Sequence, residues 1–155
     1  MKHTSFQNMK CPIARSLDHV GEWWNILILR DAFRGLTRFD EFQKSLGIAP
    51  SMLTRRLNAL VHAGLLARNQ YCEHPPRYEY VLTASGRDFK PILVLLQEWG
   101  NRHFSPEGAS VVTVNRQTGA LAQPLLIDRI SGLPIDDDVF TTEIRSPSRK
   151  VSDTD

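Results

Sequence analysis

Residues 37–64, TRFDEFQKSLGIAPSMLTRRLNALVHAG, decide the fold of this chain. Apolar residues recur at helical spacing over residues 38–46, and Thr37 can cap the N-terminus of that helix. A glycine ends it, and a second helix is predicted over residues 51–63, with Ser51 as its N-cap. Two short helices joined by a tight turn form a helix-turn-helix unit.

The helix over residues 51–63 is predicted to expose a polar and basic face. At about 100° per residue, its buried side holds Leu53, Leu57 and Leu60, with Arg56 near the edge of that side. The opposite side holds Ser51, Arg55, Asn58 and His62. An ordinary solvated face would usually include acids, yet no Asp or Glu occurs between Ser51 and Gln70. Because such side chains bond phosphates and base edges, this face predicts binding to nucleic acid.

Two further helices are predicted before this unit. The first covers residues 12–20, with a proline in its first turn. Its apolar face includes Ile13 and Leu17. The second covers residues 22–34 and is apolar almost all round, which is typical of a central, buried helix. Its adjacent tryptophans, Trp23 and Trp24, are predicted to fill the core, with a ligand site as the alternative.

Two strands are predicted next, over residues 65–71 and 78–82, because these segments are rich in aromatic and aliphatic residues. The loop between them contains two prolines, which favour an extended and exposed conformation. A helix-turn-helix unit followed by a two-stranded hairpin is the winged-helix arrangement, so we predict a mainly α fold with a small β wing. Arg68 and Arg77 are the cations of this wing, whose tip can reach along the DNA backbone or into the minor groove.

A long helix is predicted from Thr83 to about Phe104, with a wide apolar stripe. Pro91 lies inside it, which predicts a kink or, if the helix begins late, a first-turn position. The stripe consists of Phe89, Ile92, Leu93, Leu96 and Trp99. It is broader than one small core needs, so we predict that it contacts a second copy of the chain. Closure of the core within a single chain is the alternative.

Several motifs resemble, in this order, those of the HxlR-type transcriptional regulators. They are CPIAR at 11–15, GEWWNILILR at 21–30, RFDEF at 38–42, LTRRL at 53–57, AGL at 63–65, PPRYEYVLT at 75–83 and WG at 99–100. The resemblance covers roughly residues 10–104. It implies a winged-helix homodimer that binds a pseudo-palindromic operator in double-stranded DNA. Such regulators usually repress transcription and sometimes activate it, often at a neighbouring operon.

The resemblance also implies roles for individual residues. Four side chains of the recognition helix would lie near the major groove: Ser51, Thr54, Arg55 and Asn58. The helical wheel selects three of them independently, whereas Thr54 rests more on the resemblance. Arg77 matches the wing of these regulators, and Arg38, which begins the preceding helix, is expected to touch phosphate. Ile13 and Leu17 are expected to support the dimer contact made by the C-terminal stripe.

Only two cysteines occur, Cys11 and Cys72. Some HxlR-type regulators sense oxidants or electrophiles through the cysteine that matches Cys11, and a thiol beside a helix N-terminus is a candidate for that chemistry. A buried structural thiol is the alternative, and the effector would then more readily be a small molecule. No C-x-x-C pair occurs, so we predict neither a metal site nor a cofactor.

The composition of the 155 residues excludes several classes of protein. The apolar content of 41% is near average, which excludes wholesale disorder. No apolar run approaches the ~18 residues that span a bilayer, and no signal-peptide core is present, so a cytoplasmic location is expected. Residues 1–104 hold fourteen Lys and Arg against nine Asp and Glu, whereas residues 105–155 hold five against eight. A basic body with an acidic tail suggests a polyanionic partner for the body.

The chain is predicted to have four parts. They are an N-terminal arm (1–9), the winged-helix domain (10–104), a small β-hairpin extension (105–145) and a disordered tail (146–155). The extension contains a repeat offset by 13 residues, NRQTGAL at 115–121 and DRISGLP at 128–134. Each copy follows an extended stretch, so hairpins are expected. Some HxlR-type regulators carry a zinc ribbon here, and this extension resembles one that has lost its ligands.

Three classes of function remain to be compared. No phosphate-binding or nucleophile motif occurs and the five histidines are scattered, so nothing supports an enzyme. A winged helix that contacts only other proteins is the alternative to a DNA-binding regulator. The acid-free face with Thr54, Arg55 and Asn58 favours the regulator, and a gel-shift experiment would distinguish the two.

Overall fold

The computed structural model of the chain describes residues 11–136 and 138–143. Their packing divides into two compact units, with the boundary after Thr113. The first unit therefore continues beyond Phe104, where its last helix ends. The predicted N-terminal arm (1–9) and the predicted tail (146–155) lie outside the described residues.

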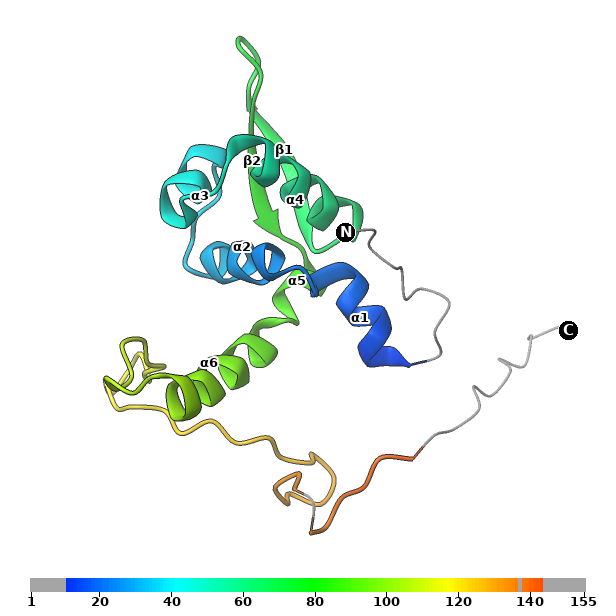
Figure 1. Ribbon diagram of the computed structural model, residues 1–155, viewed down its shortest axis with the longest axis vertical. Coiled ribbons are helices and arrows are strands. Elements are labelled where there is room, and N and C mark those ends of the chain that lie inside the picture. The colour runs from blue at the N-terminus through cyan, green and yellow to red at the C-terminus, as the bar shows by residue number, and fades with distance from the viewer. Residues whose placement is uncertain (1–10, 137, 144–155) are drawn as a thin grey trace, which may run out of the picture. The chain divides into compact units, whose positions relative to one another are not determined.

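The first unit has the predicted winged helix-turn-helix fold (Figure 1). Its elements in chain order are α1 (Pro12–Val20), α2 (Trp23–Phe33), α3 (Phe39–Leu46), α4 (Pro50–His62), β1 (Leu66–Cys72), β2 (Arg77–Leu82), α5 (Ala84–Arg87) and α6 (Lys90–Phe104). The strands pair antiparallel, and Leu66 lies opposite Leu82. Figure 1 shows their hairpin projecting beyond α3 and α4, which is the position of a wing.

The core of the first unit lies around α2, which contacts α1, α3, α4, α6 and β2. Its fully buried apolar residues are Ile28 and Leu29 of α2, Phe42 of α3, and Leu53, Leu57 and Leu60 of α4, with Leu66 of β1 beside them. Fully burying one such side chain contributes about 1.5–3 kcal/mol relative to leaving it exposed. The three leucines therefore fix the face with which α4 packs, and they leave its opposite face to solvent.

The tryptophan pair of α2 behaves differently from its predicted role. Trp24 packs against the core, but the side chain of Trp23 is 73% exposed and meets Trp24 only edge-on, with 6.1 Å between ring centres. The prediction that both fill the core is wrong for Trp23. Trp23 is the first residue of α2, and the buried residues of this helix begin only at Asn25.

Helix α3 begins one residue later than predicted, at Phe39. Its N-cap is Arg38, and the carboxylate of Glu41 accepts hydrogen bonds from the backbone N–H groups of Thr37 and Arg38, both at 2.9 Å. Thr37 was expected to cap this helix, and that expectation is wrong. With Arg38 as N-cap, Glu41 stands three residues on, which is the spacing that lets a glutamate reach back to the N-terminal N–H groups.

These two bonds lower the pKa of Glu41, the bond from the Arg38 N–H more than that from Thr37. A glutamate whose pKa is lowered in the folded state stabilises the fold at every pH above its ordinary pKa of about 4.3. This stabilisation is lost as the pH falls through the lowered pKa. We therefore expect Glu41→Gln to unfold at lower urea concentration than wild type at pH 7, with the difference shrinking below about pH 4. Urea titrations from pH 7 to pH 3 measure this. A difference that is the same at every pH would contradict the assignment.

Helix α4 begins at Pro50, and its N-cap is Ala49 rather than the predicted Ser51. Proline suits the first helical position because its fixed φ is already helical and its missing N–H would have no partner there. Ser51 therefore lies in the first turn of the helix and is exposed.

The predicted helix from Thr83 to Phe104 is split in two. The Thr83 hydroxyl accepts the Gly86 N–H at 3.0 Å and caps the short α5, and α6 starts at Lys90 with Pro91 in its first turn. A continuous helix would need Pro91 to donate to the carbonyl of Arg87, and proline has no N–H. The late start is confirmed, and the single long helix is wrong.

The predicted stripe of α6 divides into two parts. Phe89 and Leu93 pack against the core of their own chain, whereas Ile92, Leu96 and Trp99 are exposed. The core thus uses only part of the stripe, and the rest is apolar surface.

The second unit has little regular structure among its described residues, 114–136 and 138–143. The expected hairpins are reduced to two isolated bridges, Val114 with Leu121 and Ile127 with Pro134. The bridges are 13 residues apart, as the repeat predicts. In each copy a glycine with positive φ closes the turn, at 72° for Gly119 and 73° for Gly132. Within the described parts of the chain, no group of three or more His, Cys, Asp or Glu is placed to hold a metal ion, and no helix has the length and hydropathy needed to cross a bilayer.

Candidate nucleic-acid interface

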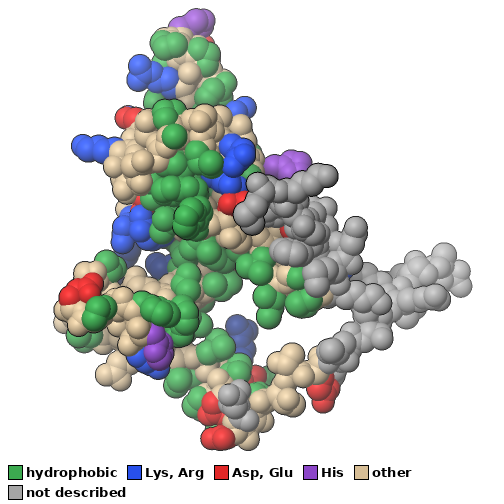
Figure 2. Space-filling view, in the orientation of Figure 1, with side chains coloured by type: hydrophobic (Ala, Val, Ile, Leu, Met, Phe, Trp, Pro, Cys, Tyr) green, Lys and Arg blue, Asp and Glu red, His purple; other side chains and the backbone are tan. Residues whose placement is uncertain are grey.

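The outer face of α4 is polar, basic and exposed. The side chains predicted to lie there are all exposed: Ser51, Thr54, Arg55, Asn58 and His62. Ala59 is exposed on the same helix, and the sequence reasoning did not include it. A small apolar side chain can contact the methyl group of thymine. Lys and Arg side chains are spread over the part of the first unit that α3, α4 and the wing form (Figure 2).

Arg55 and Arg56 are neighbours with opposite roles. The Arg55 guanidinium contacts the Met52 sulfur at 3.4 Å, and no ion pair within the described residues engages it. The side chain of Arg56 is only 12% exposed, and its Nη2 lies 2.8 Å from Oε2 of Glu22, the N-cap of α2. Arg56 therefore ties α4 to α2, whereas the Arg55 side chain is exposed on the outer face of α4.

The turn between α3 and α4 sets the orientation of α4. Gly47 ends α3 at φ 61°, in the left-handed region that glycine adopts without steric cost. Ile48 follows and is buried in the core. The Thr54 hydroxyl donates to the Pro50 carbonyl at 2.9 Å, within the first turns of α4. This bond directs the hydroxyl back to the helix, so an outside partner meets its lone pairs and the methyl group.

A buried carboxylate fixes α3 against α2. Asp31 is fully buried, and its Oδ1 accepts from Nε and Nη2 of Arg30 at 2.9 and 2.8 Å and from Nη1 of Arg34 at 3.4 Å. Its Oδ2 accepts the Ser45 hydroxyl of α3 at 2.7 Å. Sequence reasoning missed this cluster. The spacing of Arg34 three residues after Asp31 was the available signal.

The start of α3 and the wing are joined. The Tyr80 N–H donates to the Thr37 carbonyl at 2.7 Å, and the Arg38 guanidinium lies over the Tyr71 ring, 4.8 Å from its centre. Arg38 and Arg77 both line a hollow of about 500 Å³ at this junction. The structure thus brings two of the predicted phosphate contacts together. Arg68 does not line the hollow, and its guanidinium lies 4.5 Å from the centre of the Tyr78 ring.

The remaining predicted residues lie on α1 and α6. Cys11 is exposed and is the N-cap of α1, while Cys72 is half-buried in the wing, and both are free thiols. The large exposed apolar side chains of α1, α2 and α6 are Ile13, Leu17, Trp23, Ile92, Leu96, Trp99 and Phe104. Of the residues predicted to form a dimer contact, only Phe89 and Leu93 are engaged with the core.

Comparison with known proteins gives consistent matches. A family model described as HxlR-like helix-turn-helix matches residues 19–108. An uncharacterized HTH-type transcriptional regulator of Mycobacterium tuberculosis is 41% identical over 116 residues, which are 74% of this chain and 73% of that protein.

Solved structures agree with these matches. The crystal structure of PA1607, described as a candidate transcription factor, is 40% identical and covers 90% of this chain and 99% of its own, with a TM-score of 0.81. The redox regulator HypR in its reduced form is 35% identical and covers 60% of this chain and 95% of its own, with a TM-score of 0.56.

Proposed function

The chain belongs to the HxlR-like helix-turn-helix family of transcriptional regulators, and on this premise we propose that it represses a neighbouring operon as an operator-bound homodimer. The observation that carries the proposal is the face of α4, which is exposed, basic and free of acids. Two further cations, Arg38 at the start of α3 and Arg77 of the wing, line one hollow. Such a combination suits a duplex, whose phosphates attract the cations while the helix reads base edges.

In this proposal α4 enters the major groove. Arg55 donates to a guanine edge, and Asn58 pairs with an adenine, because these are the bidentate pairings that their side chains allow. Ser51 and Thr54, one turn earlier, contact phosphate or a base edge. Arg38, Arg68 and Arg77 bind the phosphate backbone and fix the register of the protein without reading sequence.

A two-fold symmetric dimer places two recognition helices on one face of the duplex. Such a dimer requires two half-sites related by the same symmetry, about one helical turn apart. We therefore propose a pseudo-palindromic operator in the region upstream of the regulated gene. The exposed apolar residues of α1 and α6 supply the contact between the two copies.

Arg55→Ala should weaken operator binding by about 1–3 kcal/mol, because it removes a bidentate contact to one base. Binding of the variant should also discriminate less between operators that differ at that base. Fluorescence anisotropy with a labelled upstream fragment, first located by gel shift and footprinting, measures both effects. Arg129→Ala, which removes the same charge in the second unit, is the matched control and should bind as wild type does.

Arg77→Ala tests a residue that is proposed to contact phosphate, in contrast to Arg55, which is proposed to contact a base. It should weaken binding to specific and non-specific DNA alike. It should also reduce the salt dependence of binding, because a protein with one fewer phosphate contact releases fewer counterions when it binds. Unchanged operator affinity in both variants would refute the interface. A wild-type chain that shifts no genomic fragment would instead favour a winged helix that contacts only proteins.

We further propose that Cys11 makes the regulator responsive to oxidants. The thiol is exposed at the N-cap of α1, beside the apolar residues proposed for the dimer contact. Among similar structures, HypR is described as a redox regulator in both its reduced and its oxidised form.

Mild peroxide treatment should therefore change operator affinity in wild type, and Cys11→Ser should abolish that change. Cys72→Ser is the matched control, since it removes the second thiol and should leave the response intact. Anisotropy titrations before and after oxidation, with mass spectrometry of the thiols, report the outcome. Identical operator affinity with and without oxidant, or a response that persists in Cys11→Ser, would contradict the redox role of Cys11.

A further inference from the structure

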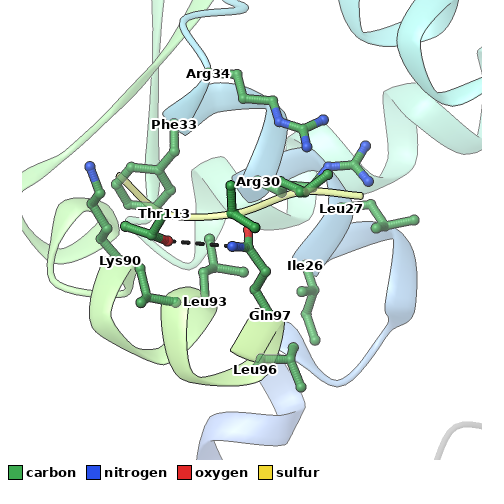
Figure 3. A pocket seen from close by; sticks show the side chains of 13 residues that line it. Ile26, Leu27, Arg30, Phe33, Arg34, Lys90, Leu93, Leu96, Gln97 and Thr113 are labelled. Carbon is green, nitrogen blue, oxygen red and sulfur yellow. Dashed lines mark hydrogen bonds between the residues drawn. The ribbon is translucent and has the colours of Figure 1, made fainter. Parts of the chain in front are cut away.

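A second concave site lies away from the proposed DNA surface, between α2, α6 and the segment 111–113 (Figure 3). Its volume is about 460 Å³, which is within the range of small-molecule sites. Most of its lining is aliphatic or aromatic, including Leu27, Phe33, Leu93 and Val94. None of the residues proposed to contact DNA lines this cavity, although Leu96, one of the exposed apolar residues proposed for the dimer contact, does.

The charges around the cavity have one sign. Arg30, Arg34 and Lys90 line it, and none of its thirteen lining residues is acidic. Figure 3 shows the guanidinium groups of Arg30 and Arg34 next to each other, with Lys90 beside the Phe33 ring. The Lys90 ammonium lies 5.9 Å from the centre of that ring.

The buried carboxylate of Asp31 contacts Arg30 and Arg34 but does not use all of their N–H donors. Asp31 takes Nε and Nη2 of Arg30 and a longer contact from Nη1 of Arg34. A guanidinium has five N–H donors, so each arginine keeps nitrogen atoms that make no bond to Asp31. Two arginines and one lysine against one carboxylate leave an excess of positive charge beside an apolar cavity.

The third wall of the cavity is fastened by side-chain amides. Asn101 Nδ2 donates to the Val111 carbonyl at 2.9 Å, and Gln97 Nε2 lies 3.4 Å from Thr113 Oγ1. These contacts hold the segment 111–113 against α6 after the helix has ended. The cavity is therefore formed within the first unit and does not require the second.

We propose that this cavity binds a small amphipathic carboxylate, such as an aryl-substituted fatty acid, as an effector of DNA binding. The carboxylate would lie at Arg30, Arg34 and Lys90, where charge-assisted bonds are stronger than neutral ones, and the ring would lie against the apolar lining. The site itself follows from the cavity, whereas the effector role rests on the proposed function.

The contacts of Asp31 give the ligand a route to the DNA-binding helices. A carboxylate held by the remaining nitrogen atoms of Arg30 and Arg34 shares these side chains with Asp31, and Asp31 in turn holds Ser45 of α3. The ligand also contacts α2 and α6 together, and α6 carries the exposed residues proposed for the dimer contact. Binding would thus change the orientation of α3 and α4 relative to the residues of the dimer contact.

Isothermal titration calorimetry of the full chain without DNA tests the site. The probes are 4-phenylbutyrate and its neutral isostere 4-phenylbutyramide, and the acid should bind about tenfold or more tightly. The double variant R34Q/K90Q should lose about tenfold in affinity for the acid and little for the amide. Both side chains are exposed, so the fold should persist, and thermal unfolding checks it. The double variant R102Q/R129Q, which removes two charges outside the cavity, should bind as wild type does.

Three results would overturn the proposal: no heat of binding with either probe at millimolar concentration, equal affinity for acid and amide, or unchanged acid binding in R34Q/K90Q. None of them bears on the operator, whose binding is measured separately by gel shift. In a second titration, saturating 4-phenylbutyrate should change the operator affinity of wild type about fivefold or more, and that of R34Q/K90Q much less. Binding of the acid that leaves operator affinity unchanged would overturn the effector role.

Discussion

Replacing Asp31 with alanine should lower the free energy of unfolding by about 2–4 kcal/mol. The carboxylate is fully buried and accepts bonds from Arg30 and from Ser45, all shorter than 3 Å. Hydrogen bonds to charged groups contribute about 1.5–3 kcal/mol each, and the cost of burying the charge offsets part of that sum. The two arginines remain partly exposed, so they can be hydrated in the variant, which keeps the loss below that of stranding a buried charge.

Urea unfolding followed by circular dichroism measures this loss. Glu98→Ala is the matched control, because Glu98 pairs with Arg102 only at 3.8 Å on the surface and should change stability by less than about 1 kcal/mol. Asp31→Ala should also weaken operator binding at a temperature where it is folded, since Ser45 no longer ties α3 to α2. An Asp31→Ala variant as stable as wild type would show that the cluster contributes nothing net to the fold.

The recognition helix was predictable because its pattern is local. A helix with leucines at positions 53, 57 and 60 can bury only one face, so the exposure of Ser51, Arg55 and Asn58 follows from the helical period alone. The winged-helix arrangement followed equally from the order of short apolar segments and breakers.

What the sequence left open depends on contacts between distant segments. The bond from the Tyr80 N–H to the Thr37 carbonyl joins residues 43 positions apart, and it places Arg38 beside the wing. Asp31 and Ser45 come from different helices, and the periodicity of each helix gives no reason to pair them. The cavity between α2 and α6 also depends on such contacts. The segment 111–113 follows the end of α6 and is held against that helix by the side-chain amides of Gln97 and Asn101.

The exposed apolar side chains of α6 are the strongest indication that the chain contacts a second copy of itself. Ile92 is 54% exposed, and Leu96, Trp99 and Phe104 are exposed on the same helix. Monomeric soluble proteins rarely expose large contiguous apolar patches, and α1 adds Ile13 and Leu17 to the exposed apolar residues. Ile92 does not line the cavity between α2 and α6, so a change there tests association separately from ligand binding.

Ile92→Asp should convert the proposed dimer to monomer at micromolar concentration. In a two-fold interface each copy would bury one unpaired carboxylate, and removing two charges from water without partners costs several kcal/mol. The monomer itself should fold normally, because Ile92 is exposed in the single chain and its replacement removes no core contact. Ile130→Asp, at a residue that is 96% exposed in the second unit, is the matched control and should sediment as wild type does. Sedimentation equilibrium gives the mass of each variant.

Operator affinity should fall together with the loss of dimer, because a monomer contacts one half-site only. A wild-type chain that is already monomeric at this concentration, or an Ile92→Asp variant that stays dimeric, would place the contact between copies elsewhere on the chain.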